Sequence, residues 1–239
     1  MTVLSVDLAY RRYRDCGTVL LRRQAGAIAV DFPSLELSGT PAPEPLAARL
    51  AHIAAEAQVH CILLDGPQAW KDEDNGLVHA RRCERALNTP AKTGPPGQVK
   101  PANYAPFVEF SIAVFDALER LGWPRLEDPL RPRRRSVESF PTAAWRGLGL
   151  RSLPAKSRTH PADLQEALRR LCAVFHLELA REPNHDELQA IVAGLGGLAL
   201  EAQNGGGFRA EGVPPFRKAG SPREGFILLP QRRFGLFPD

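Results

Sequence analysis

The sequence predicts an α/β protein whose central sheet begins with antiparallel strands and continues with parallel ones. Three observations predict this fold class. Three strand patterns occupy the first 32 residues, a helical pattern then leads into a nearly continuous apolar strand, and helices and strands alternate after that strand. Because parallel strands are joined by crossover connections, usually helices, we expect helices on both faces of the sheet.

The first three strands are expected at residues 3–8, 17–22 and 27–32. Apolar residues alternate along the third of them, which is typical of a strand with one buried face. The short connections between the three segments predict an antiparallel meander.

The next segments predict a crossover from this meander to a buried strand. Residues 33–45 hold four prolines and form a loop, and Leu46 then begins an apolar pattern with helical spacing that runs to Ala57. Residues 59–64 are nearly all apolar and are followed at once by Asp65-Gly66-Pro67. This is the pattern of a central parallel strand.

Residues 66–104 have no long periodic segment except 77–87, so we expect an irregular insertion there. Further along the chain we expect a helix over 107–121, a strand over 135–140 and a helix opened by Pro141. Apolar stripes in 164–175 and 188–198 predict two more helices. A glycine-rich turn at 204–207 and an added strand at 225–229 follow them. We predict a single domain over 1–239.

Composition places the chain among ordinary globular proteins. Its 239 residues are 44% hydrophobic and 24% charged, with 31 Lys and Arg against 27 Asp and Glu, a net charge of +4. No stretch reaches the ~20 apolar residues of a membrane span, and the N-terminus lacks the pattern of a secretion signal, so we expect a cytoplasmic protein without a membrane partner. The four cysteines are scattered, which argues against disulfides and against a zinc finger.

Basic residues are clustered, and the clusters matter more than the small net charge. Arginines fill four of the five positions 131–135, and further basic residues stand at 11–14 and at 156–158. Such clusters are often solvated surface charge. They form a phosphate-binding rim only if they border an acidic site.

Two aspartates stand in or directly after apolar strands. Asp7 lies in the first strand and Asp65 follows the strand at 59–64. We expect these strands to be neighbours in the sheet, and carboxylates near an interior need a partner or a cation. The pair therefore predicts a site for Mg²⁺ or Mn²⁺, which prefer oxygen ligands. The alternative for Asp65 is a loop cap or an ion pair with an arginine.

Three further residues are candidates with strong structural alternatives. Glu138 lies in the strand at 135–140 and faces away from the side of Val137, where a glutamate often points to solvent. Asp186 and His185 stand at the start of a helix. Asp186 suits the helix dipole there, and His185 is either a proton shuttle or part of the helix cap.

The order of elements is that of the ribonuclease-H-like fold, and actin-like kinases also begin with a meander. Six segments in sequence order carry a closer resemblance: VLSVDLAY, ILLDGP, RRCERAL, SVESFPTAAWRGLGL, NHDELQAIVAGLGGLALEAQNG and EGFILLP. Together they resemble domain-of-unknown-function family 429, described as predicted nucleases with a ribonuclease-H-like fold. The resemblance spans nearly the whole chain. The start of the last helix also resembles the C-terminal acidic helix of RuvC-type Holliday-junction resolvases.

The resemblance implies a metal-dependent nuclease acting on DNA or RNA. It implies Mg²⁺ or Mn²⁺ bound by four acids, a catalytic His185 beside them, and arginines that position phosphates, namely Arg82, Arg133, Arg134 and Arg135, with Arg81 as a further candidate. Arg82 could instead form an ion pair with Glu84. The four acids are Asp7, Asp65, Glu138 and Asp186.

One departure from the family pattern supports a different class of function. Where related helices often carry a second aspartate, this chain has Gln189. The alternative is therefore a non-catalytic nucleic-acid or protein-interaction module on the same fold. An actin-like ATP-dependent kinase is a third reading, although Ala9 to Tyr13 lack the glycine-rich phosphate hairpin of that superfamily.

Overall fold

A computed structural model describes residues 1–24, 26–202 and 207–232. Within them, eight strands form one sheet in the order β8-β3-β2-β1-β4-β7-β10-β9. A separate two-stranded sheet pairs β5 with β6. The strands are β1 (Thr2–Asp7), β2 (Gly17–Arg23), β3 (Ile28–Asp31), β4 (Cys61–Asp65), β5 (Lys92–Thr93), β6 (Val99–Lys100), β7 (Arg135–Ser139), β8 (Leu177–Leu179), β9 (Phe208–Lys218) and β10 (Ser221–Pro230).

The centre of the sheet confirms the predicted order of strands. β1, β2 and β3 pair in antiparallel fashion, β4 lies parallel to β1, and β7 lies parallel to β4. The predicted class, a ribonuclease-H-like α/β fold with a mixed sheet, is therefore confirmed. The assignment of 1–239 to one domain stays a prediction.

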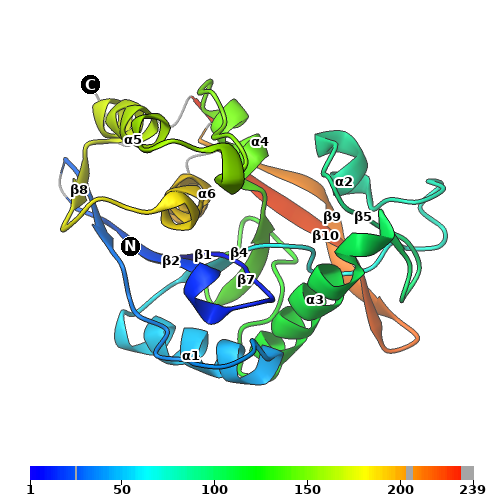
Figure 1. The fold of residues 1–239 in the computed structure, drawn as a ribbon. Helices are drawn as coiled ribbons and strands as arrows, with labels where there is room; N and C mark the ends of the chain where they lie inside the picture. The colour runs from blue at the N-terminus through cyan, green and yellow to red at the C-terminus, as the bar shows by residue number, and fades with distance from the viewer. Residues whose placement is uncertain (25, 203–206, 233–239) are drawn as a thin grey trace.

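Helices cover both faces of the sheet (Figure 1). α1 and α3 pack on one face over the apolar side chains of β1 and β4 that point to that side. α6 crosses the other face and is buried along almost its whole length, with α4 and α5 outside it. The helices are α1 (Pro43–Glu56), α2 (Arg82–Leu87), α3 (Ala105–Arg120), α4 (Pro141–Gly147), α5 (Pro161–Phe175) and α6 (His185–Glu201), with short 3₁₀ turns at Tyr13–Asp15, Ala102–Tyr104 and Lys156–Arg158.

Two strands of the eight-stranded sheet were not predicted, and each has a physical reason. β8 has only three residues, too few for a visible pattern. β9 contains Pro214 and Pro215, which usually argue against a strand, but β9 is the edge strand of the sheet, where proline is tolerated. β9 pairs with β10, which begins four residues before the predicted strand at 225–229 and lies parallel to β7.

The insertion at 66–104 is folded against the sheet rather than free of it. It contains α2 and the small β5–β6 hairpin, and the expected periodic segment 77–87 is helical only from Arg82. The glycine-rich turn predicted at 204–207 falls, except for Gly207, outside the described residues. No helix in the described part of the chain is long and apolar enough to cross a membrane.

Gly17 lets the start of α6 approach the sheet. It is paired with Asp7 across β1 and β2, and a Cβ on it would lie 2.2 Å from the backbone carbon of Asp186. Any other residue would push away the first turn of α6. The lack of a side chain at this position therefore brings Asp186 next to Asp7.

We expect Gly17→Ala to lower the free energy of unfolding by at least about 2 kcal/mol, because rigid backbone blocks the added methyl group. Urea denaturation measures this. Gly76→Ala is the control, since a Cβ there has no neighbour within 4 Å and only the left-handed backbone, with φ of 79°, opposes it at about 1 kcal/mol. Equal losses in the two variants would contradict the close approach.

Candidate active site

Asp7 and Asp65 end two neighbouring parallel strands in the same register. Asp7 pairs with Asp65 across β1 and β4, and Asp65 pairs with Ser139 across β4 and β7. Because side chains alternate along a strand, Asp7 shares the face of Val3, and Asp65 shares that of Leu63. Val3 and Leu63 belong to the core under α6. Both aspartates therefore stand at one edge of the sheet, on the side of α6.

The two carboxyl groups lie within reach of each other, and their burial disfavours a charge on both, which favours a proton shared by the pair. Burial raises the pKa of Asp7 well above its ordinary value, and the negative charge of Asp65 raises it further. Burial also raises the pKa of Asp65, to about 7, against a lowering by the hydrogen bond from Asp7. The pair thus holds a proton at pH values where an exposed pair would carry two charges.

Asp186 faces this pair from the first turn of α6. Its charge raises the pKa of Asp7, which places it close to that carboxyl. Asn184 caps the helix and forms a capping box with Glu187. Asp186 therefore has a fixed position at the positive end of a long helix.

Lys156 and His185 hold the carboxylate of Asp186. The Lys156 ammonium contacts Oδ2 of Asp186 and also lies 3.4 Å from Oδ1 of Asp15. Burial raises the pKa of Asp186, but His185 and Lys156 outweigh it, so this pKa lies below its ordinary value. Asp186 is thus an ionised acid beside a pair that shares a proton.

His185 positions Asp186 rather than facing solvent. Its Nδ1 lies 3.1 Å from Oδ1 of Asp186, and its Nε2 lies 3.1 Å from the carbonyl oxygen of Pro154. Both neighbours can accept a hydrogen bond, so the ring links the start of α6 to the loop that holds Pro154. These contacts agree with the structural alternative for His185, and its catalytic role stays a prediction.

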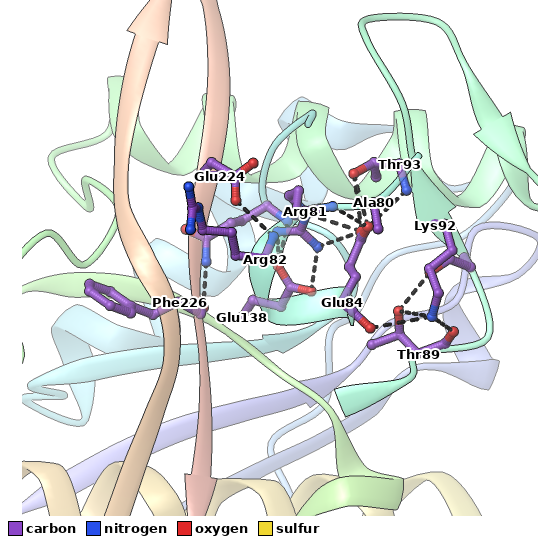
Figure 2. A network of polar contacts seen from close by, with 12 residues as sticks. Ala80, Arg81, Arg82, Glu84, Thr89, Lys92, Thr93, Glu138, Glu224 and Phe226 are labelled. Carbon is purple, nitrogen blue, oxygen red and sulfur yellow. Dashed lines mark hydrogen bonds and ion pairs between the residues drawn. The ribbon is translucent and has the colours of Figure 1, made fainter. Parts of the chain in front are cut away.

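Glu138 does not join the three aspartates. It stands one residue before Ser139, the partner of Asp65, so it points to the opposite face of the sheet. There Arg81 binds it with two hydrogen bonds, Nη1 to Oε2 at 2.6 Å and Nη2 to Oε1 at 2.8 Å (Figure 2). The expectation of a metal ligand at Glu138 needs this correction, although its charge still raises the pKa of Asp65.

Arg81 is fully buried and binds a second carboxylate, that of Glu84. Its Nε lies 3.0 Å and its Nη2 2.9 Å from Oε1 of Glu84, which also accepts hydrogen bonds from Thr93 (Figure 2). The guanidinium therefore joins β7 to α2, and Glu84 in turn joins α2 to β5. The predicted alternative, an ion pair of Glu84 with Arg82, is wrong, because Arg82 is exposed and Arg81 takes that role.

The three arginines at 133–135, which were predicted to bind phosphates, do not border the acids. Arg135 begins β7, and Arg133 and Arg134 precede it, so all three lie at the end of the strand away from Asp65. The backbone N–H of Arg134 donates to the carbonyl of His60, at the start of β4. The condition for a phosphate-binding rim at this cluster is therefore not met, because a strand's two ends lie at opposite edges of the sheet.

A different basic cluster lies beside the acids. A cavity of about 680 Å³ is lined by Asp7, Asp186 and Asp15 together with Arg11, Arg12 and Lys156. The basic clusters at 11–14 and 156–158 thus border an acidic site, which is the condition for a phosphate-binding rim. Arg11 lies over the ring of Tyr10, with its Cζ 5.4 Å from the ring centroid.

The donor set of this site suits a hard divalent cation. Asp7, Asp65 and Asp186 offer carboxylate oxygens, and Mg²⁺ uses one or two carboxylates while keeping waters and phosphate oxygens as its other ligands. Among the residues that the structure describes, no cluster of three or more His, Cys, Asp or Glu is arranged to hold a metal ion. The three aspartates therefore offer suitable oxygen donors, but within the described residues they do not form a complete metal site by themselves.

Gln189 lies one turn after Asp186 and has a partner of its own. Its Oε1 accepts a hydrogen bond of 2.7 Å from the indole nitrogen of Trp145, on α4. This contact joins α4 to α6. Gln189 is therefore used for packing between two helices, and its position does not supply an acid to the site.

No family model and no curated protein matches the chain. The resemblance to family 429 accordingly stays a prediction. Among solved structures, "Thermus thermophilus RuvC structure" matches with a TM-score of 0.43 and 16% identity over 86% of this chain and 97% of that one. "T. thermophilus RuvC in complex with Holliday junction substrate" matches with a TM-score of 0.40 and 15% identity over 86% and 96%. Nothing about the activity of this chain follows from a likeness of that size.

We expect Asp65→Asn to stabilise the metal-free protein at pH 8. The pKa of Asp65 is raised on folding, so wild-type stability falls as the pH rises from about 4 to about 7, and the variant loses less over this range. The melting temperature in EDTA should therefore exceed that of the wild type by a few degrees at pH 8 and by less at pH 5. A variant less stable than the wild type at both pH values would contradict the shared proton.

We expect Glu138→Gln to lower the free energy of unfolding by about 2 kcal/mol or more, because it leaves the buried Arg81 with one charged partner. Urea denaturation at pH 7 measures this. The matched control is Glu166→Gln, which removes exposed ion pairs with Arg169 and Arg170 and should leave the stability nearly unchanged. A neutral Glu138→Gln would show that Arg81 does not depend on this carboxylate.

Proposed function

We propose that this chain is a metal-dependent nuclease that hydrolyses phosphodiester bonds of DNA or RNA. One observation carries the proposal: Asp7 and Asp65 end adjacent central strands in register, and the first turn of α6 brings Asp186 next to them. Buried carboxylates that must hold a proton in place of a partner are suited to bind a cation. Mg²⁺ and Mn²⁺ are the cations that the oxygen donors favour.

Asp7 and Asp65 would hold the cation at the edge of the sheet. A bound divalent cation activates a water molecule and stabilises the leaving oxygen of a phosphodiester. Because its binding and the shared proton compete for the same oxygens, the pair must release that proton first. This requirement favours activity at neutral and higher pH.

Asp186 is set apart from the pair by its lower pKa. It stays ionised at neutral pH and stands across from Asp7, where it can complete the coordination or accept a proton from the attacking water. The Lys156 side chain is half exposed, so its ammonium can leave Asp186 for a phosphate oxygen without desolvation of a buried charge.

Cations of the chain would position the nucleic-acid backbone. Arg11, Arg12 and Lys156 line the same cavity as Asp7 and Asp186. A substrate phosphate drawn to these groups lies beside the acids. The aromatic ring of Tyr10, under Arg11, adds a surface on which a base can stack.

The second candidate is a non-catalytic nucleic-acid-binding module with the same fold. The observation that favours it is the hydrogen bond of Gln189 with Trp145, which gives this helix position a packing role and leaves α6 with one aspartate at the site. In that case the basic cavity binds a phosphate backbone and the acid pair keeps its proton.

Calorimetric titration of Mn²⁺ and Mg²⁺ into the metal-stripped protein, followed by hydrolysis assays, tests the proposal. We expect wild-type binding at pH 7.5 that is lost in Asp65→Asn and weakened about tenfold or more in Asp186→Asn, because each removes an oxygen ligand or its charge. Cleavage of labelled single-stranded and duplex DNA and RNA should require the metal and Asp65.

Glu138→Gln is the matched control, a buried acid of the same sheet edge that Arg81 already neutralises. It should keep Mn²⁺ binding once its melting curve confirms that it is folded at the assay temperature. Nucleic-acid binding without Mn²⁺ binding, with or without substrate present, would favour the non-catalytic module. Loss of Mn²⁺ binding in folded Glu138→Gln, with Asp65→Asn unaffected, would contradict the assignment of the ligands.

A further inference from the structure

A second cavity, of about 200 Å³, lies on the other side of Asp65. Its walls carry the rings of Tyr104, Phe107 and Phe140 and those of Pro67 and Pro90. Tyr104 and Phe107 also line the larger cavity that holds Asp7 and Asp186. The two cavities are therefore neighbours that share the wall formed by Tyr104 and Phe107, with Asp65 lining one cavity and Asp7 the other.

The charged residues in this second cavity are already paired. Glu84 and Glu138 line it, and both are bound by the buried guanidinium of Arg81 (Figure 2). Apart from Asp65 at its edge, the cavity thus presents mainly ring surfaces to a ligand.

The volume selects the size of the ligand. An apolar cavity of about 150 Å³ takes up benzene, so about 200 Å³ suits one somewhat larger planar ring system. A stacked or paired assembly of two such rings does not fit. Proteins bind unstacked nucleobases in this manner, between aromatic side chains and with hydrogen bonds to the base edge.

The neighbouring cavity supplies the other half of a nucleotide site. Arg11, Arg12 and Lys156 attract a phosphate on the side of Asp7, and the ring-lined cavity opens on the side of Asp65. Phosphate and base are the two ends of a nucleotide, joined through the sugar. A nucleotide that spans the acid pair would place its phosphate among the cations and its base among the rings.

We propose that the cavity lined by Tyr104, Phe107 and Phe140 binds one unstacked nucleobase of the substrate, next to the phosphate at the acid pair. The preferred substrate is then single-stranded or locally unpaired nucleic acid, since a base within a duplex cannot enter. This inference rests on the proposed function for the identity of the ligand, but the cavity requires no metal and no catalysis.

Ligand-observed NMR titration in EDTA tests the cavity with adenosine 5′-monophosphate and uridine 5′-monophosphate against ribose 5-phosphate, which lacks a base. We expect the nucleotides to bind about tenfold more tightly than ribose 5-phosphate, the contribution of one stacked base. Phe107→Ala, which removes a ring, and Ala91→Leu, which fills the cavity, should each abolish most of this difference. Phe216→Ala on β9, where the ring is 43% exposed, is the matched control and should not change it.

Equal binding of the nucleotides and ribose 5-phosphate to the wild type would overturn the proposal, whatever the variants do. So would a base-dependent difference that persists in both cavity variants with melting curves like that of the wild type. EDTA removes divalent cations, so this test of the base site does not depend on metal binding. Base binding in this cavity by a protein that never binds Mn²⁺ would support the base site and contradict the proposed nuclease function. Mn²⁺-dependent hydrolysis without base binding would support the nuclease function and contradict the base site.

Discussion

The in-register pairing of β1 with β4 is the constraint on which the site depends. It sets Asp7 and Asp65 side by side, and the surrounding elements determine what that proximity means. Gly17, opposite Asp7, admits the first turn of α6 and with it Asp186. A shift of either strand by one residue would turn its aspartate to the other face, away from α6.

Pattern in the sequence is enough to predict the centre of the fold and this pair. Each aspartate ends an apolar strand. The meander brings the chain back to the direction of β1, and the crossover helix then makes β4 parallel to β1, so the ends of the two strands meet at one edge. Glu138 shows where such reasoning stops. Alternation gives its face relative to Val137 but not the register of β7 against β4, and the partner Arg81 lies 57 residues earlier in the chain. The basic clusters were likewise visible, but only the three-dimensional order of the strands shows that 11–14 borders the acids while 133–135 does not.

Arg81 also explains why the long insertion is ordered. A buried guanidinium is unfavourable unless its donors are paired, and Glu84 and Glu138 pair them from two different elements. Gln68, three residues after Asp65, donates its backbone N–H to the same Glu138. The ion pair therefore anchors both the loop that follows Asp65 and the start of α2, and it fixes one wall of the ring-lined cavity.

The carboxylates at this edge of the sheet fall into two groups according to what neutralises them. Glu84 and Glu138 have a cation supplied by the chain itself, in a geometry that satisfies their oxygens. Asp7 and Asp65, in the part of the chain that the structure describes, form no ion pair with a basic side chain, and their burial and mutual repulsion favour a proton on the pair instead. A protein that needed these acids only for its fold could have neutralised them as it neutralises Glu138. Two buried carboxyl groups without a cation of the chain, on strands next to the one whose Glu138 has such a cation, are the reason to look for a cation from outside.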